Sequence, residues 1–330
     1  MTREKLRRKI FRVDEESFEK TALEIFQFQF ENNSIYRQFC LLLGKTPENV
    51  YHIQEIPFLP VEFFRDQEVI TGSFKPQKIF VSSGTTDSKA SRHLVRDLEL
   101  YEESYLVCFE NFFGNPADFV ILALLPSYLE RSDSSLIFMV EGLMKKSGRS
   151  ENGFFLYDHK SLYKKLLDLE TAQQKTWLIG VSFALLEFAE RFSIPLQYTT
   201  IIETGGMKGR REEITREELH AALERSFSMK RIAGEYGMTE LLSQAYSFSD
   251  GKFQPPPWMK ILLRDVNDPA SVNAKVSKTS GAINVIDLAN LDSCSFIATS
   301  DIGKFNGDSG FEVLGRMDYS DVRGCNLLLD

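Results

Sequence analysis

VSSGTTDSKASRH, residues 81–93, is the stretch on which the interpretation of this sequence depends. It follows a short apolar run, residues 78–81, that predicts the end of a strand. Gly84 has no Cβ, so backbone N–H groups and neighbouring hydroxyls can approach an anion closely. We therefore infer a site for a phosphate chain, and the alternative is a Ser/Thr-rich surface loop. The candidate ligands are Ser82, Ser83, Gly84, Thr85, Thr86 and Lys89.

The composition is that of an ordinary globular protein. Of the 330 residues, 43% are hydrophobic and 26% are charged, which is enough for a large core in one or two domains. The net charge of −8 argues against a general nucleic-acid binder, which needs a basic surface. No apolar run approaches the roughly 18 residues of a membrane span. The 27 phenylalanines can line an apolar pocket as well as fill a core.

The N-terminus and the cysteines indicate the compartment. The opening MTREKLRRKIFRVDEE is basic and then acidic and lacks the apolar stretch of a signal peptide, so we expect a cytoplasmic protein. Cys40, Cys108, Cys294 and Cys325 are too scattered for a metal site or a disulfide framework. We expect the first three to be core residues. Among the histidines only His93 is close to the phosphate loop.

Strands alternate with helices through the middle of the chain, which predicts an α/β fold with a large, mainly parallel sheet covered by helices on both faces. Helices are expected within residues 1–44, with Ser34 capping the second, and proline-bearing residues 56–64 are expected to be extended along the main sheet. Further strands are expected at 119–124, 177–181, 199–203 and 231–233, and further helices at 97–113, 136–145, 160–169, 183–192 and 214–227.

The character of the sequence changes near residue 250. Three consecutive prolines, 255–257, make a stiff break. Short β-like runs follow at 258–263, 281–287, 295–299 and 311–314. We therefore predict two domains: residues 1–250, an α/β domain with N-terminal helices, and residues 251–330, a smaller β-rich subdomain ending in a mobile tail.

A second motif, GEYGMTE, occupies residues 234–240 and is expected to open a short helix over 241–245. In open parallel sheets, ligands bind at the carboxyl ends of the strands. Tyr236 can stack there on a purine, Thr239 can bind a phosphate, and Glu240 can hold Mg²⁺, which favours oxygen ligands. The alternative is a glycine turn with Glu240 in the first turn of a helix.

Two further motifs lie near the C-terminus, TSDIG at residues 299–303 and GRMD at residues 315–318. A fixed carboxylate such as Asp301 suits a ribose diol because it accepts both hydroxyl hydrogens. Arg316 can add a charge-assisted hydrogen bond to ribose or phosphate. A simple β-turn is the alternative for each motif.

In this order, the motifs resemble those of the adenylate-forming (acyl-activating) superfamily of acyl-CoA ligases, luciferases and peptide-synthetase adenylation domains. Within it, the chain looks most like the long-chain acyl-protein synthetases, or fatty-acid–luciferin-component ligases. This similarity runs from about residue 50 to the C-terminus. It is carried by IPFLPVEFFR, VSSGTTDSKAS, TGGMKGR, GEYGMTELLSQ and GRMDYSDVRGCNLLLD.

The resemblance implies that ATP and Mg²⁺ activate a fatty acid as an acyl-adenylate, which passes its acyl group to a cysteine and then to a partner acyl reductase. Cys325 stands where that cysteine should be, beside the flexible Gly324, although an unpaired cysteine can also be a buried hydrophobe. By motif, Ser82 to Thr86 would hold phosphates, Gly205, Gly206 and Tyr236 would bound the adenine, Thr239 and Glu240 would serve phosphate and Mg²⁺, and Asp301 and Arg316 would hold the ribose.

The sequence departs from the superfamily pattern at two places. Asp87 and Ser88 intervene before Lys89, and Asp87 puts a negative charge near the expected triphosphate. No lysine follows Lys304, so the mobile C-terminal domain that supplies a late lysine in full-length members is expected to be missing. The acyl-protein synthetases share this second feature. The alternatives are an adenylating ligase that delivers the acyl group to CoA or an amine, and a catalytically inactive binding protein of the same fold.

Overall fold

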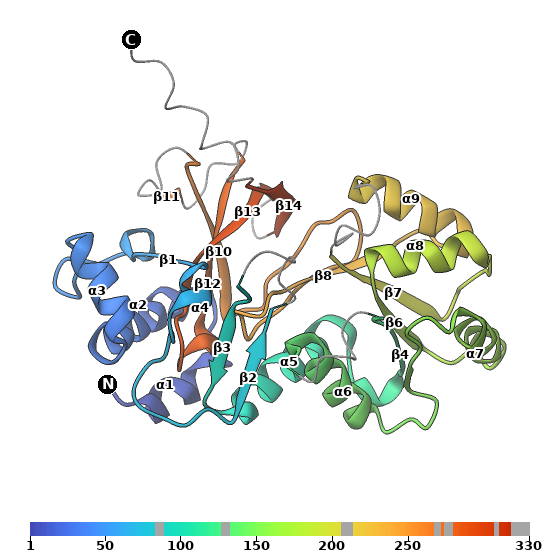
Figure 1. The fold of residues 1–330 in the computed structure, drawn as a ribbon, viewed down its shortest axis with the longest axis horizontal. Coiled ribbons are helices and arrows are strands. Elements are labelled where there is room, and N and C mark those ends of the chain that lie inside the picture. The colour runs from blue at the N-terminus through green and yellow to red at the C-terminus, as the bar shows by residue number, and fades with distance from the viewer. Residues whose placement is uncertain are drawn as a thin grey trace, which may run out of the picture.

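Two six-stranded sheets and one two-stranded sheet form the frame of the protein in a computed structural model (Figure 1). The structure describes residues 1–82, 89–126, 133–205, 214–266, 272–273, 280–306 and 310–317, with the backbone alone for residues 272, 273 and 306. The two large sheets lie side by side, and the chain crosses from one to the other between β9 and β10.

The first sheet is parallel except at one edge. In spatial order its strands are β5 (Gly153–Phe154), β4 (Val120–Leu124), β6 (Thr176–Val181), β7 (Thr199–Thr204), β8 (Ala233–Tyr236) and β9 (Ala245–Ser247). Only β9 runs antiparallel to its neighbour. Every residue of β4 and β6 is buried, as expected for continuous apolar strands covered on both faces. The predicted α/β fold with a mainly parallel sheet is confirmed.

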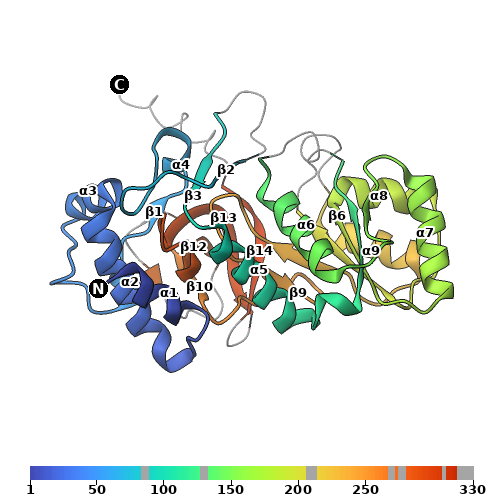
Figure 2. The same ribbon diagram turned by 90° about the horizontal axis from the view of Figure 1, so that it is seen from below.

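Helices cover this sheet on both sides. In Figures 1 and 2, α5 (Leu98–Phe113) and α6 (Ser135–Ser147) lie on one side, α8 (Ser182–Arg191) and α9 (Arg216–Phe227) on the other, and α7 (His159–Thr171) at the outer end. Local signals set their ends. The Asp97 carboxylate accepts from the N–H of Leu100 at the start of α5, and Gly148, with φ of 65°, ends α6 in the left-handed conformation.

The second sheet is mainly antiparallel. Its main path is β1 (Leu59–Pro60), β13 (Phe296–Asn306), β12 (Gly281–Asp287), β10 (Met259–Arg264) and β11 (Val272–Asn273), and β14 (Gly310–Arg316) pairs with the far part of β13. The predicted β-rich C-terminal region is therefore present. Residues 56–64 were expected to extend along the main sheet. This was wrong, because β1, within this segment, pairs with β13 of the second sheet. The chain then enters the short helix α4 (Phe63–Asp66).

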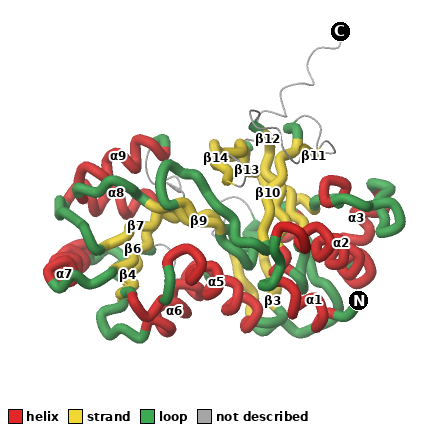
Figure 3. The backbone as a smooth tube through the Cα atoms, turned by 180° about the vertical axis from the view of Figure 1, so that it is seen from behind, coloured by secondary structure: helices red, strands yellow, loops and turns green. Residues whose placement is uncertain are grey.

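The N-terminal helices pack against this second sheet (Figures 1 and 3). Gln29 of α2 donates to the carbonyl of Asn290 over 3.0 Å. Asn33, not Ser34 as predicted, caps α3, because its side chain accepts from the N–H of Tyr36. The N-terminal elements are α1 (Arg3–Ile10), α2 (Glu15–Asn32), α3 (Ser34–Leu42) and the 3₁₀ turn η1 (Ile53–Glu55). The domain boundary at residue 250 stays a prediction.

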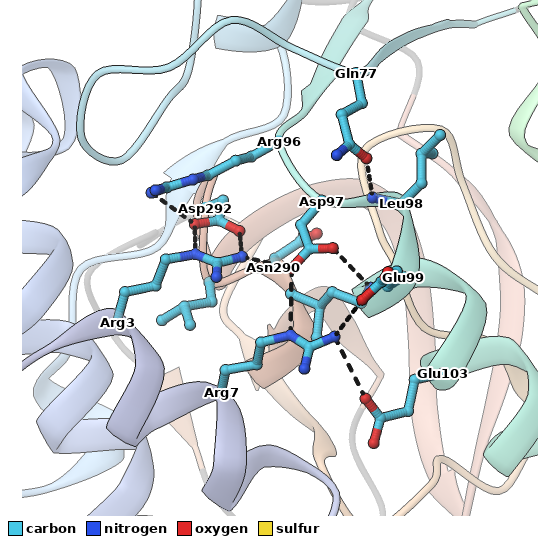
Figure 4. A network of polar contacts seen from close by, with 12 residues as sticks. Arg3, Arg7, Gln77, Arg96, Asp97, Leu98, Glu99, Glu103, Asn290 and Asp292 are labelled. Atoms are coloured by element: carbon cyan, nitrogen blue, oxygen red, sulfur yellow. Dashed lines mark hydrogen bonds and ion pairs between the residues drawn. The ribbon is translucent and has the colours of Figure 1, made fainter.

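A polar network holds α1 in place (Figure 4). Arg3 Nε donates to Asp292 over 2.6 Å, and the same guanidinium is 2.9 Å from Asp97, the cap of α5. Arg7 Nε lies 3.2 Å from Asp97, and Arg96 lies 3.6 Å from Asp292. Asp292 follows η3 (Leu288–Asn290), so the network joins α1 to both halves of the molecule.

Two segments next to the predicted motifs complete the frame. The strand expected at 78–81 is β2 (Lys78–Val81), which pairs antiparallel with β3 (Arg92–Val95). The helix expected at 241–245 is wrong: the chain makes an irregular turn and enters β9. The reason is a distant acceptor, because the N–H groups of Leu242 and Ser243 donate to the Asp287 carboxylate. A short 3₁₀ turn, η2 (Pro116–Asp118), precedes β4.

None of the helices in the described ranges combines the length and the apolar character that crossing a membrane requires.

Candidate active site

Three of the predicted site residues meet where the two large sheets approach each other. Tyr236 ends β8, and its hydroxyl donates to Asp301 Oδ2 over 2.9 Å. Arg316 Nε donates to the other carboxylate oxygen, Oδ1, over 3.0 Å. Asp301 and Arg316 face each other as register partners on β13 and β14. Residues from three strands are therefore centred on one carboxylate.

The two partners of the Asp301 carboxylate differ in their exposure to solvent. Asp301 and Tyr236 are buried, whereas 78% of the Arg316 side chain is exposed. The Tyr236 ring packs edge-on against Phe311, with 5.3 Å between the ring centroids. Burial raises the pKa of Tyr236 well above its ordinary value, so its hydroxyl stays a donor. Each carboxylate oxygen has two lone pairs and, within the described part of the chain, one side-chain partner, so Asp301 keeps the capacity to accept from a diol.

Hydrogen bonds from residues outside the first sheet hold the turn that contains Thr239 and Glu240. His93 Nδ1 lies 2.8 Å from the Thr239 carbonyl oxygen, which can only accept, so this nitrogen carries the hydrogen. Asn290 donates to the Glu240 carbonyl over 2.7 Å. The Ser91 side chain helps to lower the pKa of the Glu240 carboxyl group. The sequence singled out His93 only by its closeness to the loop, and it gave no signal for Ser91 or Asn290.

Glu240 itself is a buried carboxylate, 6% exposed. Burial raises its pKa, while the Ser91 side chain and the charges of Arg316 and Arg65 oppose that rise. Within the described ranges, no cluster of three His, Cys, Asp or Glu side chains forms a metal site. A single carboxylate fits a Mg²⁺ ion that arrives with a nucleotide, because Mg²⁺ commonly binds one or two carboxylates together with substrate phosphates.

Two further buried carboxylates lie at the carboxyl ends of β7 and β8, and sequence reasoning missed both. Thr204 donates to Glu235 Oε2 over 2.7 Å, and Ser182 donates to Glu203. Burial raises the pKa of Glu235 to about 7, the bond from Thr204 opposes this, and the charge of Glu203 adds to it. The sequence signal that could have identified Glu235 was a glutamate inside a short strand, directly before Tyr236.

The remaining predicted residues are only partly described. Ser82 Oγ accepts from the Ser91 N–H over 2.9 Å, which continues the pairing of β2 with β3. Lys89 Nζ lies 3.3 Å from Asp66 in an exposed ion pair. Gly205 follows β7 directly, and a Cβ at this position would meet nothing within 4 Å. Ser83, Gly84, Thr85, Thr86, Gly206 and Cys325, together with Asp87, lie outside the described residues.

This fold is that of adenylate-forming ligases of known structure. The protein superposes on 2-hydroxyisobutyryl-CoA ligase in complex with 2-HIB-AMP and CoA with a TM-score of 0.68 at 11% identity, covering 94% of this chain and 78% of the other. An ATP-bound RpMatB-BxBclM chimera gives 0.54 at 17% identity, covering 72% of this chain and 47% of the chimera. The chain thus spans about half the length of that chimera.

Among curated proteins, the chain is similar to two long-chain-fatty-acid–luciferin-component ligases. It is 22% identical over 326 residues to that of Vibrio harveyi, covering 92% of this chain and 84% of the relative. It is 23% identical over 315 residues to that of Aliivibrio fischeri, covering 89% and 80%. No protein-family model matches the chain. The predicted resemblance to adenylate-forming enzymes, and within them to the acyl-protein synthetases, is confirmed, and so is the prediction of a ligase.

Proposed function

We propose that this protein activates a carboxylic acid with ATP. The acid's carboxylate oxygen attacks the α-phosphorus, the bond from that phosphorus to the bridging oxygen breaks, and pyrophosphate leaves as the acyl-adenylate forms. The observation that carries the proposal is the Asp301 carboxylate, held by Tyr236 and Arg316 and set near the turn of Thr239 and Glu240. The positive charge of Arg316 acts on this turn as well, since it opposes the rise in the pKa of Glu240.

Each residue in this proposal binds or orients a group of the nucleotide. Asp301 and Arg316 hold the ribose, and Tyr236 with Gly205 and Gly206 bounds the adenine. Thr239, Lys89 and the loop from Ser82 to Thr86 bind the phosphates. Glu240 holds Mg²⁺, which when bound supplies positive charge to the phosphate oxygens. Such positioning and charge stabilisation make up most of what a protein contributes to transfer at phosphorus.

The finer proposal concerns the acid and its acceptor. The names of the two curated relatives support a long-chain fatty acid as the substrate. The Cys325 thiolate attacks the acyl carbonyl carbon, AMP leaves, and a thioester remains for delivery to an acyl reductase. The ending GRMDYSDVRGCNLLLD supports this step by its resemblance to the acyl-protein synthetases. We further propose that the protein works in the cytoplasm.

Acid-dependent exchange of labelled pyrophosphate into ATP tests the adenylation. We expect exchange with at least one acid in a broad panel that includes saturated chains of different lengths. Asp301→Ala should abolish exchange, whereas Asp118→Ala, an exposed aspartate ending η2, should leave it unchanged. A complete lack of exchange over the panel would reject adenylation and favour an inactive binding protein of this fold.

A second experiment tests Cys325. Incubation with ATP, Mg²⁺ and labelled fatty acid should give a protein label that hydroxylamine removes. Cys325→Ser should lose the label but keep pyrophosphate exchange. Cys40→Ala is the matched control and should keep the label, because burial raises the pKa of the Cys40 thiol to about 12. Full labelling of Cys325→Ser would exclude Cys325 as the acyl acceptor, whereas acyl-CoA formation without a protein label would identify CoA as the acceptor.

A further inference from the structure

A second polar site lies on the face of β8 opposite the Tyr236 side chain. Successive residues of a strand point to opposite faces, so Glu235 and Tyr236 lie on either side of β8. Glu235 and Tyr246 are register partners in the antiparallel pair of β8 and β9. Their side chains therefore share one face of the sheet, with Cβ atoms about 5 Å apart. The Tyr246 ring packs against Phe113 of α5, with 5.1 Å between the centroids.

Gln244 brings a third polar group to the same place. A Cβ on Gly237 would come within 2.5 Å of Glu235 Oε1 and 3.5 Å of Gln244 Cγ. The two side chains therefore converge over a position where only glycine leaves enough room. Glu235 is held in this orientation by Thr204, which donates to its other oxygen, Oε2, over 2.7 Å.

Two of these three side chains end in a buried atom without a partner among the described residues. They are the Tyr246 hydroxyl and Gln244 Oε1. Tyr246 is 0% exposed and Gln244 is 4% exposed, so solvent does not compensate either atom. Buried polar groups are nearly always hydrogen-bonded, and leaving one unpaired costs free energy. Unpaired atoms on the face of the sheet that carries a buried carboxyl group indicate a site for a hydrogen-bonding ligand.

The chemistry of the three groups defines that ligand. Gln244 Oε1 can only accept, Glu235 Oε1 accepts when ionised, and the Tyr246 hydroxyl can do either. Because burial raises the pKa of Glu235 to about 7, a large fraction is ionised at neutral pH. A group with one or more hydrogens to donate, a hydroxyl or an amine, satisfies this set. A saturated alkyl chain would leave the Gln244 and Tyr246 atoms unpaired.

We propose that the acid activated by this protein is a fatty acid bearing a hydroxyl or amino group, which Glu235, Gln244 and Tyr246 bind at the carboxyl end of β8. The inference rests on the proposed adenylating function. The inference adds a substrate class to that function, because Tyr236 and Asp301, the proposed nucleotide-binding residues, lie on the opposite side of the same end of β8. The acid would reach from one face of β8 to the other around that end.

Matched acids test the proposal. The panel holds unsubstituted fatty acids and their hydroxy and amino analogues of the same length, with the substituent moved along the chain. We expect at least one substituted acid to show kcat/KM for adenylation about tenfold or more above its unsubstituted partner, as one well-placed hydrogen bond provides. Comparison of the hydroxy analogues with the amino analogues shows which of the two groups donates the hydrogen bond.

Tyr246→Phe is the decisive variant because it removes the unpaired hydroxyl and keeps the ring. It should fold with an unchanged or higher Tm, yet lower the preference for the substituted acid over its unsubstituted partner about tenfold. Thr199→Val is the matched control. It removes a hydroxyl bonded to Glu170 at the other end of β7, and it should leave acid preference unchanged.

Direct binding separates this inference from the proposed function. Calorimetric titration with the substituted acid needs no catalysis, and we expect about tenfold weaker binding to Tyr246→Phe. If no acid supports pyrophosphate exchange but this difference in binding is found, adenylation is wrong and the site stands. If exchange occurs but unsubstituted acids perform as well as every substituted one, the site is wrong and adenylation stands.

Discussion

Glu235 makes the stability of the protein depend on pH. Its pKa is raised from the ordinary 4.5 to about 7 by burial, with Glu203 adding to the rise and Thr204 opposing it. A carboxyl group whose pKa is raised by folding favours the folded state below pH 4.5, and this contribution is lost as the pH rises through 7. The Glu235 charge also adds to the raised pKa values of Tyr101 and Cys108 of α5 and of Tyr246 of β9. All three groups stay neutral in this range because burial raises the pKa of each.

We therefore expect Glu235→Gln to gain stability over the wild type between pH 5 and pH 8, by up to roughly 3 kcal/mol. Urea unfolding at both pH values measures this difference. Glu99→Gln is the control, because the Glu99 side chain is 87% exposed and its substitution should shift stability equally at both pH values. A gain for Glu235→Gln that does not change with pH would contradict the assignment.

His93 is a positioning residue for the Thr239–Glu240 turn, because its Nδ1–H donates to the Thr239 carbonyl. His93→Phe removes this bond and should lower kcat/KM for ATP about tenfold. His93→Asn keeps a donor and should restore most of that loss. Burial lowers the pKa of His93 to about 4, so the pH–rate profile from pH 6 to 8 should not change in either variant. Equal losses in both variants would argue for a packing role alone.

At the scale of helices and strands, the network around Arg3 fixes α1 (Figure 4). The Arg3 and Asp292 side chains are 13% and 8% exposed, so removing Asp292 leaves the partly buried Arg3 guanidinium with Asp97 as its remaining ion-pair partner among the described residues. We expect Asp292→Ala to destabilise the protein by about 2 kcal/mol. Lys9→Ala is the control on the same helix, since its pair with Glu24 is more exposed and should contribute less than about 1 kcal/mol. Unfolding in urea measures both, and equal effects would show that the network does not hold α1.

The elements that sequence predicted well are those whose pattern is local. The apolar run at 119–124 became β4 because a strand buried on both faces needs no polar alternation. The prediction of a helix at 241–245 was wrong because the N–H groups of Leu242 and Ser243 donate to the carboxylate of Asp287, which lies far along the chain. In the candidate site, motif order singled out Tyr236, Asp301 and Arg316, and the structure brings these three side chains together. Ser91 and Asn290 could not be identified, because only tertiary packing brings them to the turn.

At the scale of the whole molecule, the candidate site depends on how the two large sheets are held together. Phe253, which follows β9, exchanges backbone hydrogen bonds of 2.8 and 3.0 Å with Phe311 of β14. Arg216, at the start of α9, donates to the Val313 carbonyl over 3.3 Å, and its Nε lies 3.8 Å from Glu203 of β7. Its guanidinium also lies over the Phe253 ring, 5.1 Å from the centroid. Arg216 therefore links the first sheet to the strand that carries Arg316.

We expect Arg216→Met to loosen this link more than it unfolds the protein. The side chain is 27% exposed and its aliphatic part is retained by methionine, so the loss of stability should stay near 1 kcal/mol. Displacement of β14 would move Arg316 away from Asp301 and weaken ATP binding about tenfold, measured by calorimetric titration. Arg225→Met, an exposed arginine on the same helix, should leave ATP binding unchanged. Unchanged ATP binding in Arg216→Met would mean that the backbone bridge between Phe253 and Phe311 is sufficient to hold the two sheets in register around the site.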